Sequence, residues 1–397
     1  MNSYLKRATE LKETMLQDRR YIHQNAERGM VLPVTSAYVR SRLEQMGYEV
    51  TGLGDSGLTV TAGDPNSERV ILLRADMDAL PMREDSGLEF ASKTDSAHCC
   101  GHDLHTTMLL AAAQMIKERE DELKGAVKFL FQPGEEVGRG AASMVEAGIL
   151  ENPKPTAVLA MHVNAKSPLL QLNYGKGCTF CSDDTMNIRI IGRGGHGARP
   201  HETVDPIKVA CHVYMALQSI KANTISPLEP VILTITGIHG GGEGHNIIPD
   251  EVELKGTVRA YNSAARADLL EQIETKAKMV AAAFGAEAEV VFNGTCAPLV
   301  CSAGFTDEIL DCAAEVLGRE RIAATSEVKM GAEDFSAITE HYPDTSAYLF
   351  IGAGPDEQTP YPYGQHNTKV VFNEDVMPYG AAVMAASAAL WLEKKAQ

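Results

Sequence analysis

The stretch RVILLRADMD (residues 69–78) decides how the first part of the chain folds. A continuous apolar run that ends in charged residues is typical of a strand buried on both faces of a parallel sheet. Two similar runs follow, GAVKFLFQPGEE (125–136) and TAVLAMHV (156–163), and the helical pattern HTTMLLAAAQMIKERE (105–120) separates the first two. This alternation predicts an α/β fold, with a mostly parallel sheet and helices on both faces.

A different pattern begins near Asp183. Alternating strand signals and two helical segments follow in the order β-α-β-β-α-β, which predicts a compact two-layer domain of about 110 residues. The α/β pattern returns in TDEILDCAAEVLG (306–318). We therefore predict a discontinuous catalytic domain of residues 1–182 and 297–397, with an inserted domain at 183–296.

The composition limits the class of protein. With 397 residues, 44% hydrophobic and 22% charged, the chain is typical of a soluble globular protein. The net charge of −17 argues against nucleic acid or an anionic membrane as a partner. The first 24 residues lack an apolar signal core and predict an amphipathic helix, so we expect a cytoplasmic protein without a membrane span. Eight cysteines are too sparse for a disulfide scaffold.

Polar residues follow each of the three buried runs. Because the carboxyl ends of parallel strands meet at one edge of a sheet, these side chains should converge there. Carboxylates gathered in a partly dry site are costly without a cation, and a divalent metal removes that cost. Cysteine, histidine and carboxylate together select zinc or a neighbouring transition ion over magnesium or calcium. The candidates are Asp76, Asp78, Glu135, Glu136 and His162, with Cys100 and His102 on an adjoining segment.

Each candidate also has a structural interpretation. Cys100 or His102 alone is more often a capping or core residue, a lone GEE is usually a solvated turn, and His162 alone is usually a core histidine. Their joint occurrence at three strand ends favours the metal site. Within the same segment we expect His98 and Cys99 to be bystanders, whereas His105 and Asp103 support the helix start or the site.

Seven motifs occur together in an order that resembles a known family. These are RADMDALP (74–81), CGHDLHTTML (100–109), FQPGEEVGRGAASMVEAG (131–148), MHV (161–163), GRGGHGARPHETVDPI (192–207), NIIPDEVELKGTVRA (246–260) and GAEDFS (331–336). They are similar to those of the aminoacylase and carboxypeptidase G superfamily of metallohydrolases. The resemblance is closest to its amidohydrolase branch, which includes hippurate hydrolases, N-acyl-amino-acid amidohydrolases and indole-acetyl-amino-acid hydrolases.

This resemblance implies a dinuclear metal site. It implies two divalent ions per subunit, with zinc expected and manganese, cobalt or nickel as alternatives. Cys100 would bridge the ions as its thiolate, and Asp76 stands where many relatives carry a histidine ligand. The implied ligands are Cys100, His102, Glu136, His162 and His366.

The resemblance also implies roles in catalysis. Glu135 corresponds to the general base and Asp78 to an acid that orients the site. His196 of the inserted domain corresponds to a residue that stabilises the oxyanion, although a surface-turn histidine is the alternative. Asn246 and Arg259 correspond to substrate-binding positions, and Arg259 could instead lie on a solvated strand face.

Three positions depart from the family pattern. HQNAE (23–27) carries Ala26 where relatives usually have proline, Cys99 replaces a small apolar residue, and the segment GQHNT around His366 is less typical. CTFC (178–181) has the spacing of a redox or zinc pair, but no second pair accompanies it, so we expect no function there.

We therefore predict an enzyme that hydrolyses the amide bond of a small N-acyl or N-aroyl amino acid. Metal-activated water would attack the acyl carbonyl with Glu135 as general base. A homodimer or higher oligomer through the inserted domain is expected. A dipeptidase or carboxypeptidase of the same superfamily is the nearest alternative. A non-catalytic metal-binding scaffold and a thiol-dependent redox protein are alternatives of other classes.

Overall fold

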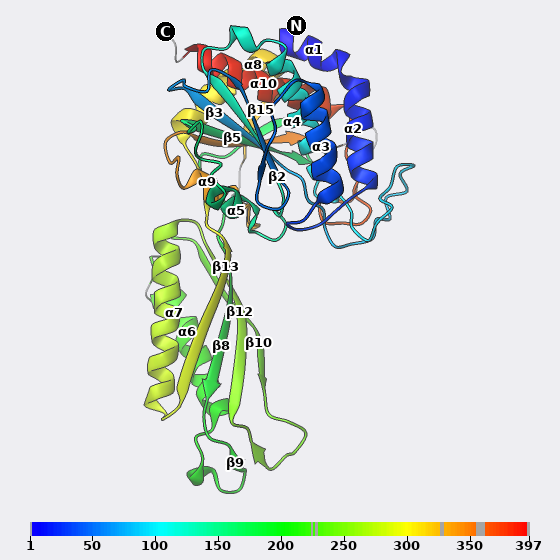
Figure 1. The fold of residues 1–397 in the computed structure, drawn as a ribbon. Helices are drawn as coiled ribbons and strands as arrows, with labels where there is room; N and C mark the ends of the chain where they lie inside the picture. The colour runs from blue at the N-terminus through cyan, green and yellow to red at the C-terminus, as the bar shows by residue number, and fades with distance from the viewer. Residues whose placement is uncertain (1, 224, 227–228, 326–328, 355–361, 395–397) are drawn as a thin grey trace. The chain divides into compact units, whose positions relative to one another are not determined.

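The computed structural model describes residues 2–223, 225–226, 229–325, 329–354 and 362–394 (Figure 1). It divides into two compact units. Unit 1 comprises the described residues of Met1–Thr179, Val300–Val328 and Asp334–Gln397. Unit 2 comprises those of Phe180–Leu299 and Lys329–Glu333. The predicted insertion, residues 183–296, lies within unit 2.

Unit 1 is built on a mixed sheet of eight strands. Its central strands β4, β3, β5 and β16 run parallel, and antiparallel pairs join β1 to β2, β2 to β4 and β16 to β6. This arrangement confirms the predicted α/β fold with a mostly parallel sheet. In sheet order the strands are β1 (Thr51–Leu53), β2 (Gly57–Gly63), β4 (Ala126–Gln132), β3 (Val70–Asp76), β5 (Ala157–Asn164), β16 (Ser346–Gly352), β6 (Leu172–Tyr174) and β15 (Ile322–Ala324).

Helices cover both faces of this sheet. Ile71, Leu73 and Ala75 of β3 belong to the same buried cluster as the apolar faces of α4 (His102–Lys117), α8 (Ala303–Leu317) and α10 (Val376–Lys394). Arg74 points to the opposite face, where it contacts Asp334 just before α9 (Ser336–Thr339), and α5 (Gly140–Glu146) lies on that side as well. All seven residues of β3 are buried, as are all seven of β4, because parallel strands covered on both sides exclude water.

The N-terminal segment differs in detail from the single helix expected. It forms α1 (Ser3–Glu10) and α2 (Lys12–Gln24), which are separated at Leu11, and α3 (Pro33–Gln45) follows. Helix α1 packs on α10 and α2 packs on α4. Among the described residues, α10 is the one helix long and apolar enough by composition to cross a membrane, and most of it is buried in the core of unit 1.

Unit 2 has a four-stranded antiparallel sheet in the order β10-β12-β8-β13. Buried and exposed residues alternate along β12 and β8, and α6 and α7 pack on the buried face. A separate short ladder pairs β9 with β11. The elements in chain order are β8 (Asp183–Ile191), β9 (Gly195–His196), α6 (Pro206–Asn223), β10 (Val231–Gly240), β11 (Ile247–Ile248), β12 (Glu251–Ala260), α7 (Ser263–Ala283) and β13 (Glu287–Cys296).

Candidate metal centre

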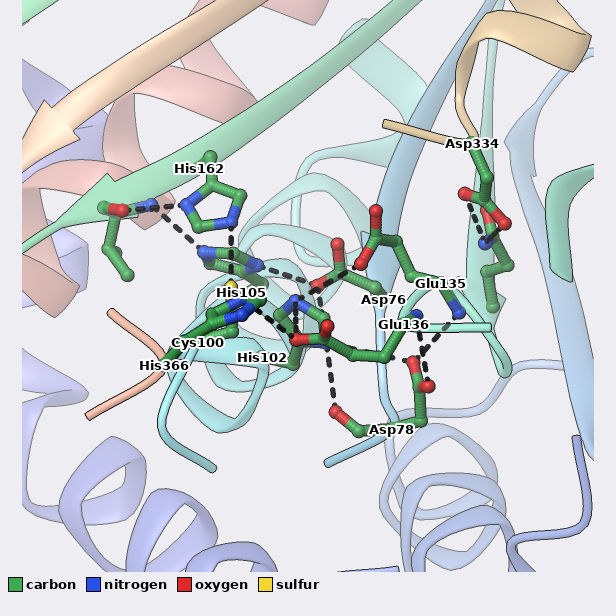
Figure 2. Close-up of polar contacts among 12 residues, drawn as sticks. Asp76, Asp78, Cys100, His102, His105, Glu135, Glu136, His162, Asp334 and His366 are labelled. Atoms are coloured by element: carbon green, nitrogen blue, oxygen red, sulfur yellow. Dashed lines mark hydrogen bonds and ion pairs between the residues drawn. The ribbon is translucent and has the colours of Figure 1, made fainter. Parts of the chain in front are cut away.

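The polar side chains of unit 1 converge where its central parallel strands end (Figure 2). Asp76 is the last residue of β3, Glu135 lies in the turn after β4, and His162 lies near the end of β5. Cys100 precedes α4, and His102 is its first residue. Neighbouring strands thus bring together residues that are far apart in sequence.

Asp78 holds the paired glutamates in place. Its Oδ1 accepts the backbone N–H of Glu135 at 2.9 Å and its Oδ2 accepts that of Glu136 at 3.2 Å. Its backbone carbonyl also accepts the Nδ1–H of His102 at 2.8 Å. Asp78 is fully buried. One aspartate therefore fixes both the turn and the orientation of a histidine ring.

Among the residues that the structure describes, no hydrogen-bond partner is found for two atoms that face each other in this cluster. They are His102 Nε2 and Glu136 Oε1, both buried and 3.9 Å apart. That distance is too long for a hydrogen bond, and buried polar atoms are normally satisfied. When the His102 ring is neutral, its single ring proton lies on Nδ1 and is donated to the Asp78 carbonyl, so Nε2 then carries a lone pair. A carboxylate oxygen and an imidazole lone pair that lack other partners fit a metal ion.

The remaining ligand candidates complete two overlapping groups. His162 donates Nδ1–H to the Val163 carbonyl at 2.6 Å, which leaves Nε2 at 3.4 Å from Cys100 Sγ. His366 places Nε2 at 3.6 Å from Glu136 Oε1. Within each of the groups Cys100–His102–His162 and Cys100–Glu136–His366, one possible ligand atom per residue lies within 4.8 Å of the others. Cys100 is common to both groups.

The electrostatics of the cluster favour a cation. Burial raises the pKa of the Cys100 thiol well above its ordinary value. Burial, with the nearby rings of His105 and His102, lowers the pKa of His162 well below its ordinary value, so this ring is neutral. Burial opposes protonation of His102, but Asp76 and Cys100 outweigh burial and raise its pKa. The raised pKa of His102 shows that a positive charge is favoured beside Asp76 and Cys100. A divalent cation would supply such a charge, and it would deprotonate a coordinating thiol.

Asp76 and His105 form a neighbouring arrangement of a different kind. Asp76 Oδ1 accepts Nδ1–H of His105 at 2.6 Å, and its Oδ2 accepts Arg74 Nη1 at 2.7 Å. His105 Nε2 accepts the backbone N–H of Val163 at 2.9 Å. Asp76, His102 and His105 also lie at metal-binding distances. Because both side-chain oxygens of Asp76 and both ring nitrogens of His105 have partners, we interpret this pair as a support for the neighbouring strand.

Backbone conformation brings two ligand candidates into position. Gly101, between Cys100 and His102, has a φ of 98°. A Cβ there would lie 2.4 Å from Val163 Cγ2, so only glycine fits. His366 has a φ of 62°, and its backbone N–H donates to the Cys99 carbonyl at 3.0 Å. A left-handed backbone at a histidine is uncommon and often marks a functional site.

Three other predicted residues lie in unit 2. His196 and Asn246 are close together, because the Asn246 carbonyl accepts the backbone N–H of Gly197 at 2.8 Å. His196 is exposed, and its Nδ1 accepts the backbone N–H of Ala198 at 3.1 Å. Arg259 lies on β12 and forms an ion pair with Asp183 at 2.6 Å.

Two buried networks were not predicted from the sequence. Arg74, Gln132 and Asp334 form one on the opposite face of the sheet. An arginine inside the apolar run of β3 and the motif GAEDFS were the available signals. In the other network, Asp103 Oδ2 accepts Arg19 Nε at 2.7 Å and His23 Nδ1 at 2.8 Å, which ties α2 to the start of α4.

Comparison with known proteins supports the dinuclear interpretation. A model of peptidase family M20/M25/M40 matches residues 72–389. The chain is 34% identical over 383 residues to thermostable carboxypeptidase 2 of Saccharolobus solfataricus, with 95% of each chain covered. It is 36% identical over 387 residues to IAA-amino acid hydrolase ILR1-like 4 of Arabidopsis thaliana, with 95% of this chain and 86% of the relative covered. The Bacillus subtilis YXEP protein, described as a dinuclear metal-binding peptidase, has a TM-score of 0.79 at 28% identity, with 97% of this chain and 99% of that chain covered. These similarities confirm the resemblance seen in the motifs.

Proposed function

Because the chain belongs to peptidase family M20/M25/M40 and is a metal-dependent hydrolase of amide bonds, we propose that it cleaves N-acyl or N-aroyl amino acids. The products would be a carboxylic acid and a free amino acid. The observation that carries this proposal is that the Asp78 carboxylate accepts hydrogen bonds from the backbone N–H groups of two consecutive glutamates, Glu135 and Glu136. It holds Glu136 among the ligand candidates and Glu135 beside them, which gives each glutamate a separate role.

We propose that Cys100, His102, Glu136, His162 and His366 hold two divalent ions. Zinc suits this mixture of donors best, and manganese, cobalt or nickel are alternatives. When bound, such ions lower the pKa of a coordinated water and polarise a carbonyl group. The membership of Cys100 in both ligand groups supports its role as the shared ligand.

Glu135 is the proposed general base. In the proposed reaction it accepts a proton from the attacking water as the new C–O bond forms. It then returns that proton to the nitrogen as the C–N bond breaks. Glu135 Oε2 lies 3.8 Å from His102 Nε2, so its carboxylate borders the ligand cluster. Asp78 contributes by accepting the backbone N–H of Glu135, which fixes the position of this residue.

We propose that His196 stabilises the oxyanion. Its Nδ1 accepts a backbone N–H, so a neutral ring carries its proton on Nε2, which can donate to a developing negative charge. Asn246 is proposed to contact the substrate nearby. Arg259 is proposed as a second substrate contact, but it would have to exchange or share its ion pair with Asp183.

A carboxypeptidase or dipeptidase remains the second candidate, since the chain resembles a carboxypeptidase about as closely as an IAA-amino acid hydrolase. The test assays purified protein for metal content and for amino-acid release. Its panel contains benzoyl-, acetyl- and indole-acetyl-amino acids beside dipeptides. We expect Glu135→Gln to retain its metal and lose turnover by several orders of magnitude. Glu146→Gln, an exposed change on α5, is the matched control and should keep wild-type turnover. Retained turnover in Glu135→Gln would refute the mechanism, and turnover of dipeptides alone would refute the substrate class.

A further inference from the structure

Asp334, labelled in Figure 2, accepts hydrogen bonds from three segments of unit 1. Its Oδ1 accepts Arg74 Nη2 and Gln132 Nε2, both at 2.8 Å. Its Oδ2 accepts the backbone N–H of Ala141 at 2.8 Å and lies 2.9 Å from the same Gln132 nitrogen. Asp334 is 2% exposed, so these bonds form away from water. They are correspondingly strong because donor or acceptor is charged.

The partners of Asp334 stand at the two ends of one loop. Gln132 is the last residue of β4, and Ala141 lies in the first turn of α5. The loop between them carries Glu135 and Glu136. Its ends meet closely, since a Cβ on Gly140 would lie 1.8 Å from the Pro133 carbonyl oxygen. Asp78 therefore binds the backbone in the middle of the loop, and Asp334 binds residues at its two ends.

Arg74 connects this loop with the strand beside it. Its Nε donates to Gln132 Oε1 at 2.9 Å and its Nη1 donates to Asp76 Oδ2 at 2.7 Å. Asp76 in turn supports His105. One buried guanidinium therefore fixes the base of the loop relative to the strand end beside which the ligand candidates lie.

We propose that Asp334 is a positioning residue for the glutamate loop. It acts through Gln132 and Ala141 to hold the Glu135 carboxylate, which has an oxygen within 4.8 Å of an Asp334 oxygen, at the reacting water. This inference rests on the proposed role of Glu135. Misplacing a reacting group by about 1 Å can cost about 100-fold in rate. Loss of the hydrogen bonds of Asp334 should therefore lower kcat and leave the binding of substrate and metal largely intact.

The test compares Asp334→Asn with Asp18→Asn. Asparagine keeps the shape of Asp334 but turns a donor toward Arg74, Gln132 or the Ala141 amide. Asp18, on α2, is also a buried carboxylate, but it pairs with Arg42 and accepts the Tyr38 hydroxyl, both of which lie on α3. We expect Asp334→Asn to lower kcat about 10- to 100-fold at full metal occupancy, with KM changed less than about threefold. Asp18→Asn should lower stability without this loss of kcat.

Hydrogen–deuterium exchange of residues 132–141 supplies a readout independent of turnover. We expect faster exchange of this peptide in Asp334→Asn and unchanged exchange in Asp18→Asn. If Asp334→Asn does not fold, Gln132→Met serves in its place. It removes the hydrogen bonds from Gln132 to Asp334 but keeps those from Arg74 and Ala141, so it should lower kcat and speed exchange to a smaller extent. Wild-type kcat with unchanged exchange would overturn the proposal, as would full recovery of rate by saturating metal. If exchange is faster in Asp334→Asn but the Glu135→Gln variant is still active, the role of Glu135 is refuted, whereas the structural role of Asp334 in holding the loop is not.

Discussion

Substitution of Gly101 by alanine tests whether the backbone between two ligand candidates is essential. A left-handed backbone costs an L residue roughly 1–2 kcal/mol. The new Cβ would lie 2.4 Å from Val163 Cγ2 and 3.2 Å from the Phe372 ring, which forces neighbouring groups apart. Such overpacking costs roughly 1–3 kcal/mol. We therefore expect Gly101→Ala to lower the free energy of unfolding by about 2–5 kcal/mol.

The displacement should also weaken metal binding, because Cys100 and His102 flank the substitution. If only 1.4 kcal/mol of the strain falls on the ligands, zinc affinity drops about tenfold. Gly87→Ala is the matched control, since Gly87 has a φ of 76° and open space where its Cβ would be. It should show only the backbone cost, roughly 1–2 kcal/mol, with wild-type zinc affinity. Urea unfolding and zinc titration measure both effects. If the two variants were equally stable and bound zinc equally well, the reasoning would be wrong.

Three further predictions concern charge, buried donors and metal. Hydrogen bonds from His23 and neighbouring groups outweigh burial and lower the pKa of Glu84 to about 2, so its stabilising effect is present above pH 4.5 and lost as pH falls toward 2. The deficit in unfolding free energy of Glu84→Gln, up to about 3 kcal/mol, should therefore shrink over that range in urea titrations. The Lys128 ammonium donates to the carbonyls of Ile149, Glu151 and Pro153, so Lys128→Met should cost about 2–4 kcal/mol and speed exchange of 149–153 without changing metal content. Chelated protein should unfold at a lower urea concentration than protein reloaded with zinc. At a free zinc concentration of 100 times the Kd, the difference in unfolding free energy should be about 2.7 kcal/mol, and coincident unfolding curves would contradict a metal site in the folded state.

The central sheet could be predicted because its signal is local. Buried parallel strands need continuous apolar runs, and residues 70–76 and 126–132 are such runs. The interruption at Leu11 could not be predicted, because the amphipathic pattern continues through it. It depends on tertiary contacts, with α1 on α10 and α2 on α4.

The residue types of the site could also be predicted, but the partners that position them could not. Asp103 could equally have been a helix-start acid on the sequence alone. In the structure it is fully buried against Arg19 and His23, which are more than 75 positions away in the chain. Asp334 posed the same difficulty, since its partners Arg74 and Ala141 come from separate elements. Contacts over such separations leave no periodic signal in one sequence.

Hydrogen-bond satisfaction separates ligand candidates from their supports in a way that residue type does not. His102 and His105 lie one turn apart on α4. Within the described part of the chain, His105 has partners for both ring nitrogens, whereas His102 has a partner for only one. A buried polar atom without a partner costs roughly 1–3 kcal/mol. Glu136 Oε1 has the same deficit. An ion bound to both atoms would remove both costs at once, so metal binding and the stability of unit 1 should depend on the same atoms. This dependence is the reason that a change such as Gly101→Ala, which moves the ligands without removing any, should lower zinc affinity and unfolding free energy together.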